Sequence, residues 1–319
     1  MPVNEFELIN EYFKRAHTDS DEVVVGIGDD AAVIRSINHK DLVVSIDTLV
    51  ANVHFPLNTS AYDIGWKALA VNLSDMAAMA AQPAWFTLAL TLPESSRDWL
   101  DAFSHGLFSL AKQFNLPLVG GDTTRGPLSI TIQIAGNVAT DRALLRSGAQ
   151  PGDDIYVSGT LGDAALALAL LQSGVGTERI AAELLSRLNR PEPRVKLGMA
   201  LAELAHCAID ISDGLLADLQ HMLTAASLGA EIDTRLLPKS TAFNAMSDSI
   251  EESLAMQLNG GDDYELCFCV PPEHKNKIAM VASECDIPLT RIGKVCISNM
   301  ICDSGGTELN PDRLGYQHF

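Results

Sequence analysis

Strand-like and helix-like segments alternate along the first half of the chain, and this order limits the possible folds more than any other feature. Apolar runs or period-two alternation predict strands over residues 41–46, 85–92 and 129–138. Helical periodicity predicts helices over residues 63–81 and 99–114. A chain that alternates in this way is expected to fold as layers of mixed α/β structure.

A polar stretch with glycine and proline, residues 146–154, interrupts this order and is typical of a domain boundary. The second half is predicted to contain strand 155–157, glycine loop 158–163 followed by a helix, a helix that opens at Asp213, and strands 265–270 and 288–295. The chain has 319 residues, more than one typical core holds. We therefore predict two α/β domains, residues 1–147 and 148–319.

Composition excludes several classes of function. The net charge of −19 argues against nucleic acid as a partner, since phosphate binding needs a basic surface. No uninterrupted apolar stretch is long enough to span a membrane, and residues 1–12 contain no apolar segment of a secretory signal. The six cysteines include no CxxC pair, so we expect reduced thiols, a cytoplasmic protein and no zinc site.

Aspartates gather in six short segments, beside glycine or at the ends of apolar strands. The segments are residues 26–30 (GIGDD), 45–48 (SIDT), 72–75 (NLSD), 120–126 (GGDTTRG), 210–214 (DISDG) and 260–265 (GGDDYE). Each alone has a structural interpretation, because Asp-Gly pairs make turns and Ser or Asp before a helix caps it. Asp75 fits that interpretation poorly, because small apolar residues surround it in its helix and a buried carboxylate is costly unless it is paired or binds metal.

The chemistry of such clusters favours a hard divalent cation. Two carboxylates about 4 Å apart repel by about 4 kcal/mol at an effective dielectric near 20, so converging aspartates either protonate or bind a cation. Oxygen ligands from Asp, Ser, Thr and carbonyl groups suit Mg²⁺ rather than zinc. Because the segments hold few basic residues, an anionic nucleotide would need bridging Mg²⁺, as phosphoryl transfer requires.

Other candidate residues each leave two interpretations open. The glycine loops at residues 26–30 and 158–163 could hold phosphate with their N–H groups or serve as turns between strand and helix. Arg146 could bind a phosphate or form a surface ion pair. His54 could be structural or could bind a ligand, and Tyr316 could anchor the C-terminal core or stack on a flat ring.

Taken together and in order, the segments resemble the thiamine-monophosphate kinase family, part of the aminoimidazole ribonucleotide synthetase-like superfamily. The matching stretches are GIGDDAAV, SIDTLVANVHF, KALAVNLSDMAAM, GGDTTRGPL, TDRALLRSGAQPGD, SGTLGDAA, RPEPRV, AIDISDGL, GGDDYELCF and GYQHF. The resemblance implies a two-domain fold of the α/β (α+β) class. It further implies an N-terminal domain that binds ATP and Mg²⁺ and pairs its sheet across a homodimer, and a larger C-terminal α/β domain that completes the active site.

The resemblance also implies roles for particular residues. Ligands of several Mg²⁺ ions would be Asp30, Ser45, Ile46, Asp47, Asp75, Asp122, Asp210 and Asp213. Nucleotide-binding positions would be Gly121, Asp122, Arg146 and Ser212. Positions that hold thiamine monophosphate would be His54, Asp262 and Tyr316.

The implied reaction is in-line attack by a phosphate oxygen of thiamine monophosphate on the γ-phosphorus of ATP, a phosphotransfer with a phosphate acceptor. No general base and no catalytic side chain are expected, because the nucleophile is already anionic and catalysis comes from metal electrostatics and positioning. Two positions depart from the family pattern. Ile46 stands where relatives often carry a hydroxyl residue, so that only its backbone carbonyl could bind metal, and Asp262 stands where relatives commonly carry Glu.

Three alternatives remain. A selenophosphate or aminoimidazole ribonucleotide synthetase would share the fold, although the former usually has an N-terminal reactive cysteine and no Cys precedes Cys207. A metal-dependent phosphohydrolase usually carries DxDx[TV], and residues 47–49 lack its second acid. A non-catalytic cation binder is the third, although no EF-hand loop is present.

Overall fold

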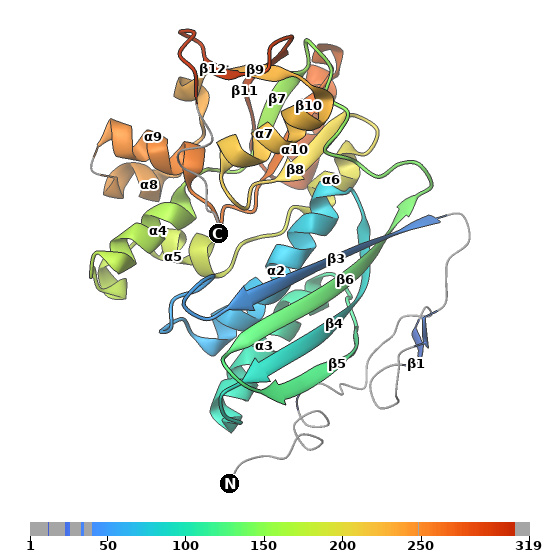
Figure 1. The fold of residues 1–319 in the computed structure, drawn as a ribbon, viewed down its shortest axis with the longest axis vertical. Helices are drawn as coiled ribbons and strands as arrows, with labels where there is room; N and C mark the ends of the chain where they lie inside the picture. Colours follow the sequence, from blue (N-terminus) through green and yellow to red (C-terminus); the bar gives the residue numbers. More distant parts are fainter. Residues whose placement is uncertain (1–11, 13–22, 26–32, 35–39, 248, 310–319) are drawn as a thin grey trace. The chain divides into compact units, whose positions relative to one another are not determined.

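The computed structural model describes Tyr12 and residues 23–25, 33–34, 40–247 and 249–309. The chain divides into two compact units, one of Met1–Met76 and Ala81–Asp141, the other of Ala77–Ala80 and Arg142–Phe319 (Figure 1). No helix in these described ranges has the length and apolar character needed to cross a bilayer.

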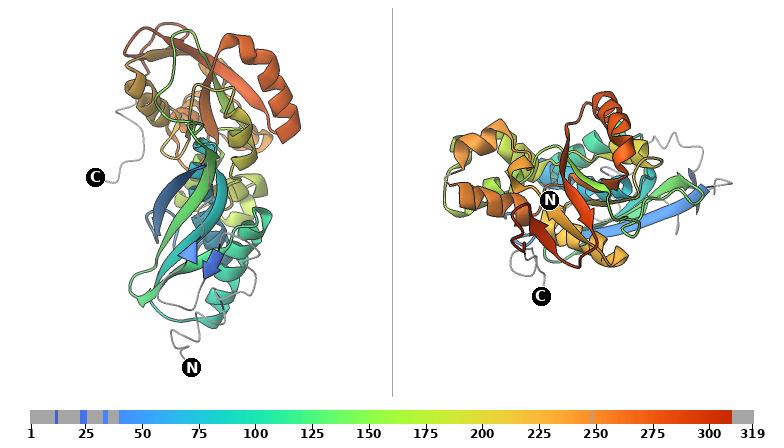
Figure 2. Two further views of the ribbon diagram at one scale, coloured as in Figure 1. Left: turned by 90° about the vertical axis from the view of Figure 1, so that its right-hand side faces the viewer. Right: turned by 90° about the horizontal axis from the view of Figure 1, so that it is seen from above.

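The first unit is a four-stranded sheet covered by helices. Its strands, in the spatial order β3-β6-β4-β5, are β3 (Lys40–Val50), β6 (Ser129–Ala139), β4 (Gln82–Leu92) and β5 (Leu118–Arg125). The pairs β3/β6 and β6/β4 are antiparallel and β4/β5 is parallel. Helices α2 (Ala61–Ala78) and α3 (Arg97–Gln113) lie on one face of this sheet (Figures 1 and 2). A two-stranded antiparallel ribbon, β1 (Val23–Val25) and β2 (Val33–Ile34), precedes it in the chain.

The alternation read from the sequence sets which face of this sheet is buried. On β6, Ile130, Ile132 and Ile134 are buried, whereas the intervening Thr131 and Gln133 are not. The other face is not wholly polar. Its β3 side chains include three apolar residues that are about half exposed or more: Leu42 (58%), Val44 (49%) and Ile46 (62%).

The second unit is built on a six-stranded mixed sheet of order β12-β9-β11-β7-β10-β8. Its strands are β7 (Asp154–Ser158), β8 (Cys207–Asp210), β9 (Gly229–Ile232), β10 (Leu266–Val270), β11 (Leu289–Cys296) and β12 (Ile301–Asp303). Its helices are α4 (Asp163–Gln172), α5 (Ala182–Asn189), α6 (Val195–Leu201), α7 (Leu215–Ala226), α8 (Thr241–Met246), α9 (Ile250–Asn259) and α10 (Lys275–Cys285), with 3₁₀ turns η2 (Thr177–Arg179), η3 (Thr234–Leu236) and η4 (Pro272–His274). Only the pair β12/β9 is parallel among the described strand pairs of this sheet.

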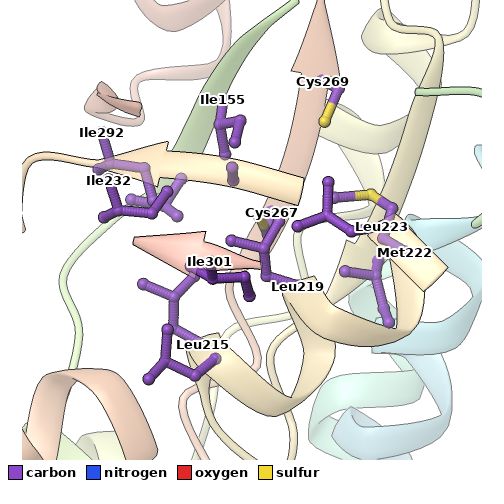
Figure 3. Packing of buried hydrophobic residues seen from close by; sticks show 14 of the residues in the cluster. Ile155, Leu215, Leu219, Met222, Leu223, Ile232, Cys267, Cys269, Ile292 and Ile301 are labelled. Carbon is purple, nitrogen blue, oxygen red and sulfur yellow. The ribbon is translucent and has the colours of Figure 1, made fainter. Parts of the chain in front are cut away.

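Helix α7 packs on this sheet through one apolar face. Leu215, Leu219, Met222 and Leu223 recur at helical spacing and are fully buried beside strand residues such as Ile155 (Figure 3). A second buried cluster joins α4, α5 and α8 around Phe243. Both units are α/β, as expected from the order of elements. The expected helix at Asp213 begins instead at Leu215, because the N–H groups of residues 212–214 bond to a side chain one turn later.

A buried ion pair fixes the start of β10 in the second unit. Glu265 is 2% exposed, and its carboxylate accepts hydrogen bonds from Nε (2.7 Å) and a terminal nitrogen of Arg194 and from Oγ of Ser158 (2.5 Å). Gly159 must be glycine beside it, since a Cβ there would lie 2.0 Å from the Glu265 carboxylate and its φ is +58°. The pair therefore joins the loop after β7, the segment before α6 and the start of β10.

We predict that Arg194→Met destabilises the protein by about 3–5 kcal/mol, because it leaves the Glu265 carboxylate buried without its main partner. Urea-induced unfolding measures the loss. Arg235→Met is the control, since Arg235 pairs with Asp233 at the surface with 79% of its side chain exposed, and should change little. Equal urea midpoints for wild type and Arg194→Met would contradict this role.

Candidate functional site

Two carboxylates meet where β3 faces α2 in the first unit. Ser45 and Asp47 are two residues apart on β3 and therefore point to the same face, toward Asp75 on α2. The Ser45 hydroxyl donates a hydrogen bond to Oδ2 of Asp75, and Asp47 is hydrogen-bonded to Asp75 as well. Three of the predicted ligands of this unit, Ser45, Asp47 and Asp75, thus form one oxygen-lined cluster.

Asp47 is held where a negative charge is unfavourable. Burial, then the charge of Asp75 and the hydrogen bond to it, raise the pKa of Asp47 from 3.8 to about 7. A divalent cation would oppose this shift, because it offsets both negative charges at once. Mg²⁺ commonly uses one or two carboxylates and completes its shell with water and substrate phosphate, so Ser45, Asp47 and Asp75 fit it. Within the described part of the chain, no group of three or more His, Cys, Asp or Glu side chains could hold a metal ion.

Ile46 does not point toward this cluster. Its side chain is 62% exposed on the opposite face of the sheet from Ser45 and Asp47. Strand alternation would turn a hydroxyl at this position away from the two aspartates as well, so the expected loss of a side-chain ligand at Ile46 stays a prediction. Only the backbone of Ile46 lies next to them.

Asp122 lies apart from the Asp47–Asp75 pair. It is exposed on β5, where it pairs with exposed Ala89, and β6 and β4 separate β5 from β3. Three strand spacings amount to about 14 Å, too far for one ion to contact both side chains. Gly121 beside it has a structural reason, since a Cβ there would lie 1.9 Å from the carbonyl oxygen of Leu88.

His54 follows β3 and has a defined tautomer. The N–H of Val50 donates to Nδ1 of His54 (2.9 Å), so a neutral ring carries its hydrogen on Nε2 and can donate there. Nζ of Lys67 donates to the carbonyl oxygen of His54 (3.3 Å), although Lys67 is only 2% exposed. Sequence reasoning passed over Lys67, whose one signal is a lone lysine among the apolar residues of its helix.

In the second unit, the backbone joins two predicted segments. The N–H of Asp262 donates to the carbonyl of Ser212 (2.9 Å), and the N–H of Tyr264 donates to the carbonyl of Ile211 (2.8 Å). This places the predicted substrate residue Asp262 beside the segment that carries Asp210, Ser212 and Asp213. Asp210 is buried, and Ser212 and Asp213 are half-buried.

Two residues of the loop at residues 260–265 have an unusual backbone conformation. Asp262 and Tyr264 both have positive φ, +69° and +49°. Aspartate tolerates this region, whereas an aromatic residue there carries about 1–2 kcal/mol of strain. The Tyr264 hydroxyl donates to Oδ1 of Asp262 (3.1 Å) and so orients the carboxylate.

The glycine loop at residues 158–163 was a candidate phosphate site. In the structure, a backbone N–H group of this loop already donates to a side chain of the protein. The N–H of Gly162, at the N-terminus of α4, donates to both carboxylate oxygens of Asp263 (3.0 Å each). The Asp263 side chain thus takes the position at this helix N-terminus where an anion could otherwise bind. This loop is therefore a strand-to-helix turn closed by Asp263.

Three predicted residues remain. Asp30 and Tyr316 lie outside the described residues. Arg146 is exposed, and no ion pair joins it to another described residue, so its surface ion-pair interpretation gains no support.

The comparisons with known proteins agree with this two-unit architecture. Residues 28–138 match AIR synthase related protein, N-terminal domain, and residues 150–299 match AIR synthase related protein, C-terminal domain. The fold is therefore that of AIR synthase related proteins.

Relatives that match over their full length identify the particular family within this fold. Thiamine-monophosphate kinase of Escherichia coli is 46% identical over 323 residues, with 100% of this chain and 99% of that protein covered. A crystal structure of thiamine-monophosphate kinase from Stenotrophomonas maltophilia has a TM-score of 0.90 at 47% identity and covers 97% of this chain and 99% of that chain. A structure of AaThiL complexed with AMPPCP and TMP has a TM-score of 0.79 at 30% identity, with 100% and 99% covered. The chain belongs to the thiamine-monophosphate kinase family.

We predict that Asp263 makes the stability of the protein depend on pH. Burial, above all, raises its pKa well above 3.8, and the charges of Glu265, Asp163 and Asp262 add to this against the bond from Gly162. The folded state therefore keeps a proton that the unfolded state releases, and stability falls as pH rises from about 4 toward the raised pKa.

Asp263→Asn cannot ionise but still accepts from Gly162. The unfolding temperature of this variant should therefore rise relative to that of the wild type as pH increases from about 5 to about 8. Thermal unfolding across this range measures the difference. Glu251→Gln, an exposed position on α9, is the control and should follow the wild type. A gap between Asp263→Asn and wild type that stays constant with pH would refute the assignment.

Proposed function

We propose that this chain transfers the γ-phosphate of ATP to thiamine monophosphate, giving thiamine diphosphate and ADP. Family membership supports the reaction, and the relative AaThiL is complexed with AMPPCP and TMP. The structural observation that carries the chemistry is the half-buried Asp47–Asp75 pair with Ser45, an oxygen cluster whose negative charge favours a bound cation.

The acidic segments supply the Mg²⁺ ligands in this proposal. When bound, Mg²⁺ would link phosphate oxygens to the protein and offset the charge of the transferred group. Asp47, Asp75 and the Ser45 hydroxyl would hold it in the first unit. The remaining ligands that we assign are Asp30, the backbone carbonyl of Ile46, Asp122, Asp210 and Asp213.

The nucleotide and the substrate are assigned to different residues. Gly121, Asp122, Arg146 and Ser212 would contact ATP, and the exposed guanidinium of Arg146 suits a phosphate. His54 would donate from Nε2 to thiamine monophosphate, which Asp262 and Tyr316 would also contact. The shorter side chain of Asp262 is oriented by the Tyr264 hydroxyl, which supports a role despite its reduced reach.

No residue needs to remove a proton from the nucleophile. A phosphate oxygen of thiamine monophosphate is already anionic at neutral pH, so the protein's task is to align it with the γ-phosphorus and to shield the charge. The residues above bind and orient the reactants, and we assign no catalytic base.

The test is ADP formation from ATP and Mg²⁺ with thiamine monophosphate, with thiamine as the negative control. ADP should form only with the monophosphate and should cease when EDTA removes the metal. ADP formed only with the acceptors of the related synthetases would identify one of those enzymes instead. Phosphate release without any acceptor would indicate a hydrolase, and metal binding without turnover a cation-binding protein.

Asp75→Asn should lower the activity of the protein without lowering its stability. An amide at this position removes the repulsion with Asp47, so the metal-free variant should unfold at the same or a higher temperature than wild type. Turnover should fall by at least about a hundredfold, since several kcal/mol of charge stabilisation is lost. Asp98→Asn, exposed in the first turn of α3, is the matched control and should keep wild-type turnover. Near-normal turnover of Asp75→Asn would exclude the metal role.

We further propose that the chain forms a homodimer through the sheet of its first unit. Strand β3 is 11 residues long, lies at the sheet edge and exposes Leu42, Val44 and Ile46, and such an apolar edge strand is a surface that invites pairing. A second copy of the chain is the occupant that the family resemblance implies.

The double variant Leu42→Lys and Val44→Lys should sediment as a monomer, because it places like charges on both copies of the surface. Ile250→Lys, at an 86% exposed residue of α9, is the control and should remain dimeric. A dimer that survives the double variant would place the interface elsewhere.

A further inference from the structure

One carboxylate accepts several hydrogen bonds from the backbone of the loop at residues 211–214. The N–H groups of Ser212, Asp213 and Gly214 donate to the same oxygen, Oδ2 of Asp218, at 3.0, 3.1 and 3.1 Å. Three successive N–H groups on one acceptor leave this stretch of backbone with a single orientation. None of the sequence motifs includes Asp218.

The carbonyl side of the same loop is also bonded. The carbonyls of Ile211 and Ser212 accept from Tyr264 and Asp262, and the N–H of Ile211 donates to the carbonyl of Glu265 (2.8 Å). The main chain of residues 211 and 212 is therefore fully used within the protein. The side chains of Ser212 and Asp213 remain to contact a ligand.

Asp218 is itself fixed by the core. It lies in the first turn of α7, is 3% exposed, and its N–H donates to the carbonyl of Gly214 (3.0 Å). The neighbouring Leu219 and Met222 are fully buried in the core cluster. The loop is thus bonded to a side chain that the packing of α7 cannot easily move.

We propose that Asp218 is a positioning residue that holds Ser212 and Asp213 in the orientation needed to bind the magnesium–nucleotide complex. The inference rests on the proposed function for the identity of that ligand. In this proposal Asp218 acts through the loop, since its Oδ2 accepts from the loop backbone. Replacing a residue that hydrogen-bonds to a metal ligand, without touching the metal, commonly changes metal affinity or activity about 10- to 100-fold.

Asp218→Ala removes the acceptor, and Asp218→Asn keeps a carbonyl oxygen that can accept the same N–H groups. Asp153→Ala is the matched control, since Asp153 is also 3% exposed and accepts from the N–H of Gln150 (2.9 Å) and pairs with His206. If Asp218→Ala does not accumulate as folded protein, Asp218→Ser, which keeps a shorter acceptor, replaces it. The measurements are titration with AMPPCP and Mg²⁺, amide exchange of residues 212–214, and thermal unfolding.

Both alanine variants should unfold at a lower temperature, but only Asp218→Ala should bind AMPPCP with Mg²⁺ about 10- to 100-fold more weakly and exchange its loop amides faster. Asp218→Asn should bind within a few-fold of wild type. Binding by Asp218→Ala as tight as by Asp153→Ala would overturn the proposal, as would Asp218→Asn binding as weakly as Asp218→Ala. Because this binding needs no turnover, failure to make thiamine diphosphate would count against the proposed function alone.

Discussion

The repulsion between Asp47 and Asp75 is the constraint on which the proposed chemistry depends. Strand β3 and helix α2 hold the two carboxylates together, and buried neighbours such as Leu49, Leu73 and Met76 keep them from separating. Charges about 4 Å apart at an effective dielectric near 20 would cost about 4 kcal/mol, so the pair retains a proton or binds a cation. A sequence selected for stability alone would place apolar side chains here. The retained pair is therefore best explained by a ligand that carries positive charge.

Three other buried acids, all in the second unit, instead accept hydrogen bonds from donors of the protein itself. Asp218 accepts from three N–H groups, Asp263 accepts from Gly162, and Glu265 is paired with Arg194. These side chains fix loops of the second unit. The Asp47–Asp75 pair differs from them because two acidic groups bond to each other there, a difference that the net charge of −19 conceals.

Periodicity predicted the long strands and helices well, and the ordered motifs predicted the family. Strands β8, β9 and β12 have only three or four residues, too few to show a period, and β5 was missed because two glycines and an acid disfavour a strand. Contacts such as Gly162 to Asp263, separated by 101 residues, and Arg194 to Glu265, separated by 71, leave no local pattern. Alternation along β3 already implied that Ile46 faces away from Asp47, an inference the motif comparison obscured.

Anomalous diffraction from crystals grown with Mn²⁺ and AMPPCP tests the central claim most directly, because Mn²⁺ accepts the same oxygen ligands as Mg²⁺. The account predicts an anomalous peak about 2.1 Å from carboxylate oxygens of both Asp47 and Asp75. Bound nucleotide whose metal peaks all lie away from these two side chains would contradict it.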